Sequence, residues 1–166
     1  MTGGRGEMVG WEGEAAMGAG TDAARDRLVV TGGEDLHVLG RFFRAMLLAL
    51  LKDPRKVRAL EGMEMVVAVD PPAHPGSALT LDFHGGRVAL QSGVSPRPDI
   101  VLECEAAVLM RLARVPPGPA AIKFLLTNEG KALLAGMRSG ELKIRGAVRH
   151  PLGMMRFAGF LAPGVR

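Results

Sequence analysis

The most apolar long segment of the chain, residues 36–52, has the spacing of an α-helix. Its polar residues recur at near-helical intervals, so they form one narrow stripe on an otherwise apolar cylinder. These residues are His37, Arg41, Arg44 and Lys52. Pro54 follows shortly afterwards and marks the end of the predicted helix. A helix that is apolar nearly all round needs apolar neighbours on more than one side.

Alternating apolar and polar residues predict four strands after this helix, at 61–70, 77–83, 87–93 and 97–105. The second and third strands are joined by a short segment with two glycines, which is typical of a hairpin. A fifth alternating segment spans residues 140–148. It places Leu142, Ile144 and Val148 on one face of a strand and charged residues on the other.

Further helices are predicted at 105–113, 120–137 and 151–161, the last starting at Pro151. Because the strands cluster instead of alternating with helices, we predict an α+β fold. It has a mainly antiparallel five-stranded sheet with helices on one face and water on the other.

The first 33 residues are rich in Gly and Ala and show no periodicity, so they are predicted to form a flexible acidic tail. The domain itself is then expected to span residues 34–166. The N-terminal sequence lacks the basic start and apolar core of a signal peptide, so a cytoplasmic setting is expected.

Charge and composition narrow the possible partners. The chain carries a net charge of +4, and the acidic residues are concentrated near its start, so the domain is basic. A basic domain favours an anionic partner, such as a lipid head group, coenzyme A, a membrane surface or nucleic acid. Tyr is absent and the Phe residues lie in apolar runs, so few rings are free to stack on bases. We therefore expect no binding to nucleic acid.

The sequence shows little sign of catalytic chemistry. The single cysteine, Cys104, excludes an internal disulfide and a cysteine-based zinc site. The four histidines are scattered and match no metal-binding motif. Glu103 and Glu105 share the polar face of a strand, where solvated charge explains them. We predict no catalytic residue, no metal and no cofactor, and hence a protein that is not an enzyme.

Several motifs together resemble the sterol carrier protein 2 (SCP2) family. They are the hairpin LTLDFHGGRVAL (79–90), the alternating strand DIVLECE (99–105), the Leu-rich helix AAVLMRLA (106–113) and the motif GELKIRG (140–146) before an apolar last helix. The likeness covers residues 36–161. Ala147 stands where the family often has an acidic residue. Residues 114–128 form a longer connection than is usual, which we expect to act as a lid or to narrow the cavity.

The resemblance implies an apolar tunnel between sheet and helices that holds a lipid without chemical change. The expected ligand is a fatty acid, an acyl-coenzyme A, an isoprenoid or a sterol-like molecule. The predicted wall of this tunnel consists of Leu81, Phe83, Leu102, Leu109, Leu112, Phe124, Leu133, Met137, Ile144, Met154, Met155, Phe157 and Phe160.

Two alternatives remain open at this stage. In one, the same fold serves as an accessory module in quinone or lipid metabolism, and its apolar C-terminal helix docks on an enzyme or a second copy of the chain. Transient contact with a membrane surface belongs to the same range of partners. In the other, helices 36–52 and 151–161 pack on each other and leave a solid core.

Overall fold

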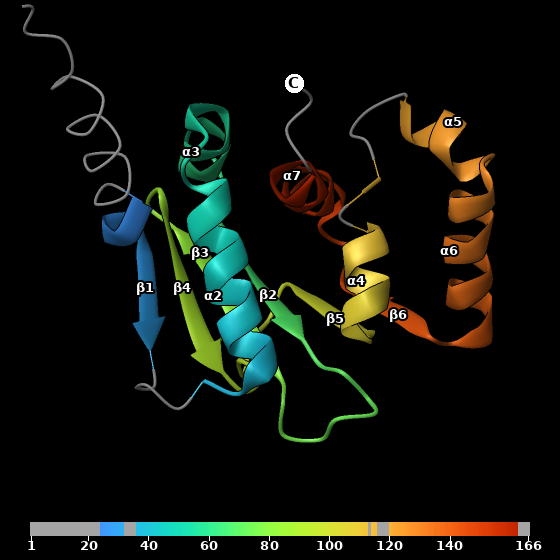
Figure 1. Cartoon of the computed structure of the whole chain (residues 1–166), viewed down its shortest axis with the longest axis horizontal. Coiled ribbons are helices and arrows are strands. Elements are labelled where there is room, and N and C mark those ends of the chain that lie inside the picture. The colour runs from blue at the N-terminus through green and yellow to red at the C-terminus, as the bar shows by residue number, and fades with distance from the viewer. Residues whose placement is uncertain (1–23, 32–35, 113, 116–119, 163–166) are drawn as a thin grey trace, which may run out of the picture.

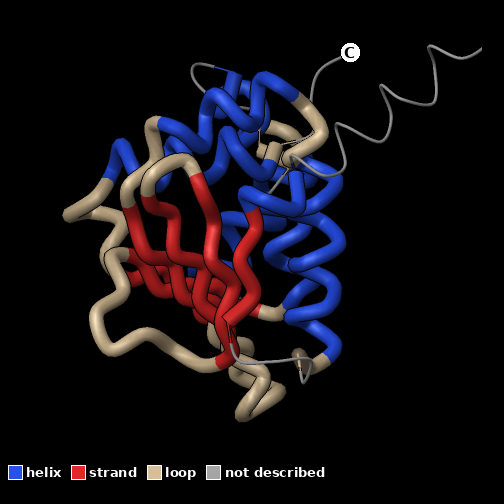
Figure 2. The backbone as a smooth tube through the Cα atoms, turned by 90° about the vertical axis from the view of Figure 1, so that its left-hand side faces the viewer, coloured by secondary structure: helices blue, strands red, loops and turns tan. Residues whose placement is uncertain are grey.

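The helices of this protein gather on one face of a six-stranded sheet (Figures 1 and 2). A computed structural model describes residues 24–31, 36–112, 114–115 and 120–162. The strands are β1 (Leu28–Thr31), β2 (Met65–Val69), β3 (Leu79–His84), β4 (Arg87–Ser92), β5 (Ile100–Cys104) and β6 (Leu142–Arg145). The helices are α2 (Val38–Leu50), α3 (Pro54–Glu61), α4 (Ala106–Leu112), α5 (Ala120–Leu125), α6 (Asn128–Ser139) and α7 (Pro151–Leu161).

The strand order across the sheet is β1-β4-β3-β2-β5-β6. The β2–β3, β3–β4 and β5–β6 pairs are antiparallel, whereas β1–β4 and β2–β5 are parallel. The predicted α+β class with helices on one face is confirmed. The predicted count of five strands is wrong by one.

The sixth strand lies inside the segment that the sequence assigns to a tail. Leu28 is paired with Val88 and Val30 with Leu90, so β1 extends the sheet beyond the hairpin. Four residues, LVVT, are too few to show a clear alternation, which explains why the pattern does not predict this strand. Residues 1–23 lie outside the described part of the chain.

Helix α3 is a second element that the pattern does not predict, because Pro54 reads as a stop for the preceding helix. Pro54 is the first residue of α3, where its missing N–H costs nothing. Asp53 caps this helix, and its carboxylate accepts a hydrogen bond of 2.8 Å from the Arg55 N–H. The apolar segment 36–52 therefore forms α2, and α3 begins only a few residues after α2 ends.

Two further boundaries differ from the prediction. The segment 120–137 forms two helices, because Thr127 caps α6 and accepts a hydrogen bond from the Gly130 N–H. The strand β6 ends at Arg145, and Gly146 has a φ of +84°, which turns the chain away from the sheet. Val148 is therefore 95% exposed, and its predicted place on the buried face is wrong.

The inner face of the sheet forms the core. Residue pairs on the central strands β2 and β3, such as Met65 with Phe83 and Val67 with Leu81, are buried on this face. Helix α7 covers the centre of this face. The Phe83 ring contacts the rings of Phe157 and Phe160 edge to face, with centroids 5.9 and 5.7 Å apart.

The opposite face is not as wet as the alternation of polar residues predicts. Thr80 is fully buried there. Its hydroxyl donates a hydrogen bond of 2.8 Å to the Gly93 carbonyl and accepts one of 2.9 Å from the Ser95 N–H. The loop after β4 therefore folds back over this part of the sheet. Elsewhere on this face, Glu103 forms an ion pair of 2.6 Å with Arg145.

A buried cation joins α3 to the end of α7. The Lys56 ammonium donates hydrogen bonds of 2.7 Å to the Gly159 carbonyl and 2.6 Å to the Ala162 carbonyl. Carbonyls at the C-terminal end of a helix have no partner within the helix, and the helix dipole favours a cation there. Burial lowers the pKa of the Lys56 ammonium, and the negative charge of Asp53 opposes this effect.

We expect Lys56→Met to lower the free energy of unfolding by about 1–3 kcal/mol, because two carbonyl oxygens lose their donor. Urea denaturation followed by circular dichroism measures this change. The control is Lys131→Met at an exposed position of α6, where a change within about 0.5 kcal/mol is expected. Equal stability of the two variants would show that Lys56 does not hold α7.

Candidate functional site

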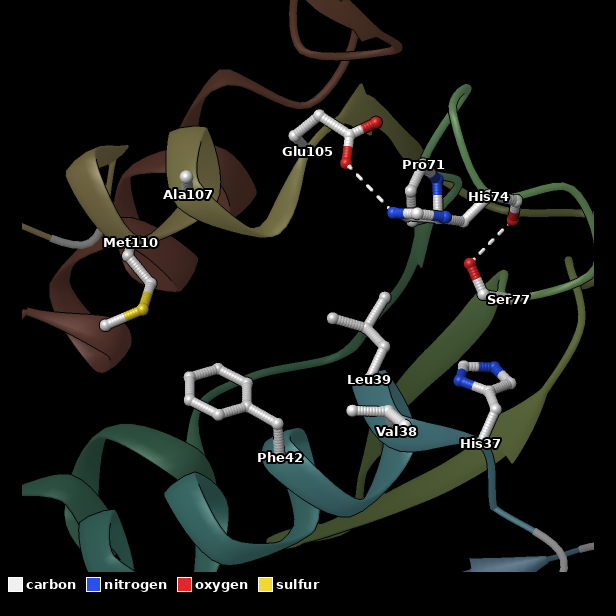
Figure 3. A pocket seen from close by; sticks show the side chains of 10 residues that line it. All are labelled: His37, Val38, Leu39, Phe42, Pro71, His74, Ser77, Glu105, Ala107 and Met110. Carbon is white, nitrogen blue, oxygen red and sulfur yellow. Dashed lines mark hydrogen bonds and ion pairs between the residues drawn. The ribbon is translucent and has the colours of Figure 1, made fainter.

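A pocket of about 780 Å³ opens between the N-terminal half of α2, helix α4 and the loop that follows β2 (Figure 3). Ten described residues line it. They are His37, Val38, Leu39, Phe42, Pro71, His74, Ser77, Glu105, Ala107 and Met110.

Most of the pocket surface is apolar. Leu39 and Phe42 of α2 and Met110 of α4 project into the space between the two helices (Figure 3). Phe42 is 38% exposed and Met110 is 47% exposed, which is a large solvent contact for side chains of this size. Burying these side chains against a guest would be favourable, since apolar surface gains free energy when it leaves water.

The polar lining residues gather at one end of the pocket, near the loop after β2 (Figure 3). Glu105 accepts a hydrogen bond of 3.1 Å from the Ala73 N–H, and its other oxygen lies 3.9 Å from Nε2 of His74. The Ser77 hydroxyl donates a hydrogen bond of 2.6 Å to the His74 carbonyl. The pocket therefore has an apolar part and a polar part, as an amphiphilic guest requires.

His37 lines the pocket but serves mainly to start α2. Its Nδ1 accepts a hydrogen bond of 3.3 Å from the Gly40 N–H, and its Nε2 lies 3.2 Å from the Ala78 carbonyl. The second contact requires Nε2 to carry the proton, because a carbonyl only accepts. Both ring nitrogens of His37 are therefore occupied by the backbone.

The residues predicted to form a tunnel wall lie elsewhere, and none of them lines this pocket. Eight are buried in the core: Leu81, Phe83, Leu102, Leu109, Leu112, Leu133, Phe157 and Phe160. Phe124, Ile144 and Met154 are partly buried, whereas Met137 and Met155 are exposed. Their role in binding stays a prediction.

Sequence reasoning missed the pocket residues, although one signal pointed to them. The predicted helix 36–52 is apolar on nearly all sides, so its apolar residues cannot all face the sheet. The consecutive residues Phe42 and Phe43 show this. Phe43 is fully buried in the core, whereas Phe42 faces the pocket. Pro71, His74 and Ser77 lie in a loop whose path no periodic pattern predicts.

The predicted insertion 114–128 lies partly outside the described residues. Its described helix, α5, packs against α6, and a Cβ atom on Gly130 would lie 2.2 Å from the Phe124 carbonyl oxygen. The described part of the insertion therefore does not line the pocket.

A smaller pocket of about 270 Å³ lies at the start of α7. Glu64, Arg149, His150 and Arg156 are among its lining residues. Three of these groups already have partners. Glu64 accepts a hydrogen bond of 3.0 Å from the Gly85 N–H, His150 lies 3.7 Å from the Asp99 carboxylate, and Arg156 donates to the Gly62 carbonyl. This pocket is too small and too polar for a long hydrocarbon chain.

Cys104 lies on β5 next to Glu105 but is fully buried. Burial, with a smaller effect of the Glu105 charge, raises the pKa of the Cys104 thiol to about 11. A thiol with this pKa carries almost no thiolate at neutral pH and is a poor nucleophile. Among the described residues, no group of three or more His, Cys, Asp or Glu side chains is arranged to hold a metal ion.

The chain is similar to known proteins in its fold. No family model matches the chain, and no curated protein sequence matches it. A solved structure described as "UbiJ-SCP2 Ubiquinone synthesis protein" matches with a TM-score of 0.51 and 19% sequence identity, covering 75% of this chain and 88% of that chain. This protein therefore has an SCP2-like fold.

Two other solved structures match at lower TM-scores. A crystal structure of sterol carrier protein 2 gives a TM-score of 0.43 at 17% identity, covering 73% of this chain and 90% of that chain. The conserved hypothetical protein TT1886 from Thermus thermophilus gives 0.35 at 16% identity, covering 81% of this chain and 94% of that chain. The fold assignment rests on the first structure, whose TM-score is above 0.5. None of the helices described is long and apolar enough to cross a membrane.

We expect Cys104 to react with a thiol reagent such as dithiobis-nitrobenzoate only after unfolding, because the native thiol is buried and protonated. Absorbance of the released thiolate, followed with and without urea at neutral pH, measures this. Fast reaction of the native protein would show that the Cys104 thiol is accessible and can act as a nucleophile, which would contradict this expectation.

Proposed function

We propose that this protein is a non-enzymatic carrier, acting in the cytoplasm, that binds the hydrocarbon part of a lipid in the pocket between α2 and α4. The supporting observation is the pocket itself, whose 780 Å³ falls within the range of small-molecule sites. A second observation is that the side chains projecting into it are large, apolar and partly exposed.

The energetics favour a guest with a long apolar chain. Each methylene removed from water contributes about 0.8 kcal/mol, so about ten of them contribute about 8 kcal/mol. Association costs on the order of 4–15 kcal/mol must be offset before binding is observed. Fatty acyl, isoprenoid and sterol-like molecules have enough apolar surface to meet this requirement.

We expect the double variant Phe42→Asp, Met110→Asp to bind the fluorescent probe N-phenyl-naphthylamine with a dissociation constant at least about tenfold higher. The reason is that two carboxylates would enter the apolar part of the pocket. Fluorescence titration of the purified chain measures the dissociation constant. Leu134→Asp is the matched control, since Leu134 is a partly exposed apolar residue of α6 that does not line the pocket.

Mass spectrometry of a solvent extract from the purified wild-type protein adds an independent test of the same proposal. A lipid is expected in the wild-type extract and should be depleted in the pocket variant. A clean extract, together with unchanged probe binding in the Phe42→Asp, Met110→Asp variant, would contradict carriage in this pocket.

A second candidate function is docking through the exposed face of α7. Leu152 is 70% exposed and Met155 is 57% exposed. Val148, which precedes them in the sequence, is also exposed. The other side of α7 cannot serve, because Phe157 and Phe160 are completely buried against Phe83. Exposed Arg149 and Arg156 flank the face, which also suits an anionic membrane surface.

If α7 joins two copies of the chain, Leu152→Asp, Met155→Asp should convert a dimer into a monomer while probe binding stays unchanged. Light scattering after size-exclusion chromatography, repeated across a dilution series, measures the mass. Sedimentation with anionic vesicles tests the membrane alternative on the same two proteins. If the wild-type protein is a monomer and does not sediment with the vesicles, this face of α7 has no role in self-association or membrane binding.

A further inference from the structure

The polar end of the pocket limits which head group a bound lipid can have. This inference rests on the proposed function and concerns the same site. Four polar residues lie there, namely His37, His74, Ser77 and Glu105. Their remaining hydrogen-bonding capacity follows from the bonds that each already makes within the protein.

Three of these four side chains have little to donate. The Ser77 hydroxyl gives its proton to the His74 carbonyl at 2.6 Å, so its oxygen is left as an acceptor. Glu105 is a carboxylate and accepts only, with one oxygen bonded to the Ala73 N–H at 3.1 Å. Both ring nitrogens of His37 are occupied by backbone groups. The open positions at this end are therefore mostly acceptors, and a guest must supply donors.

The charge at this end disfavours an anion. None of the ten described lining residues is Lys or Arg, and Glu105 is the one carboxylate among them. The remaining polar side chain, His74, already faces Glu105, whose oxygen lies 3.9 Å from its Nε2. The Glu105 side chain is 39% exposed, so a guest carboxylate or phosphate placed beside it would meet a like charge whose repulsion water screens only in part.

We propose that this pocket binds amphiphiles whose head group donates hydrogen bonds and carries no negative charge, such as a hydroxyl or an amino group. The head lies against Glu105 and Ser77, and the tail lies between Phe42 and Met110. Lipids that end in a free carboxylate, and acyl chains esterified to a phosphate-bearing carrier, are disfavoured by the same geometry.

The test compares guests that share one hydrocarbon chain. Dodecanol, dodecylamine and dodecanoate are titrated at neutral pH against N-phenyl-naphthylamine bound to the full-length protein. Dodecanol and dodecylamine are each expected to displace the probe at least about tenfold more strongly than dodecanoate. This ratio on the wild-type protein decides the inference whether or not any variant folds.

The variant Glu105→Gln tests whether the charge of Glu105 causes the preference for dodecanol over dodecanoate. The amide oxygen keeps an acceptor for the Ala73 N–H, while the negative charge is removed and a donor is added. The preference for dodecanol over dodecanoate is expected to fall to about threefold or less. Glu103→Gln is the matched control, because Glu103 lies two residues earlier on β5, pairs with Arg145 and does not line the pocket. Its preference should equal that of the wild type.

The possible results separate this inference from the proposed function. Equal or stronger displacement by dodecanoate on the wild-type protein overturns the inference and leaves lipid carriage standing. A tenfold preference that survives Glu105→Gln overturns the assignment to Glu105. If the probe does not bind at all, the proposed function itself fails, and the inference fails with it.

Discussion

The structure depends on covering the inner face of the sheet. Six strands turn an apolar surface to one side, and that surface must be removed from water for the domain to fold. Helix α7 covers its centre through the edge-to-face contacts of Phe157 and Phe160 with Phe83. Lys56 holds the end of α7 against α3 by bonding its last carbonyls. Helix α7 is rich in apolar residues because it closes the core.

The position of α7 determines where space is left for a guest. Because α7 occupies the middle of the sheet, α2 and α4 lie on either side and do not pack tightly against each other along the length of α2 (Figure 1). The residues between them, Phe42 and Met110, keep much of their surface exposed. The loop after β2 and the end of β5 add a polar boundary. A closed core beneath α7 and an apolar pocket between α2 and α4 thus occur in the same layer of helices.

The sequence predicts the architecture well and the site poorly, for physical reasons. Alternation and helical spacing located β2 to β6 and α7, because burial on one side of an element imposes a period. The strand β1 is too short to show one, and Pro54 marks a helix start as well as a stop. The apolar residues predicted to form a tunnel wall include Phe83, whose ring the structure places in contact with the rings of Phe157 and Phe160. No periodicity distinguishes an apolar side chain that faces another side chain from one that faces a guest. The pocket depends on how α2, α4 and a loop meet, which is set by tertiary packing.

The most direct test of this account is to locate a bound chain by photochemical labelling. A fatty alcohol with a diazirine in its tail is bound to the purified protein, irradiated and mapped by tandem mass spectrometry of the peptides. The account predicts labels on α2 between Val38 and Phe42 and on α4 between Ala107 and Met110, and competition by unlabelled alcohol should remove them. Labels concentrated on Phe83, Phe157 and Phe160 instead would show that the guest enters between α7 and the sheet, and would contradict the claim that the buried side of α7 closes the core.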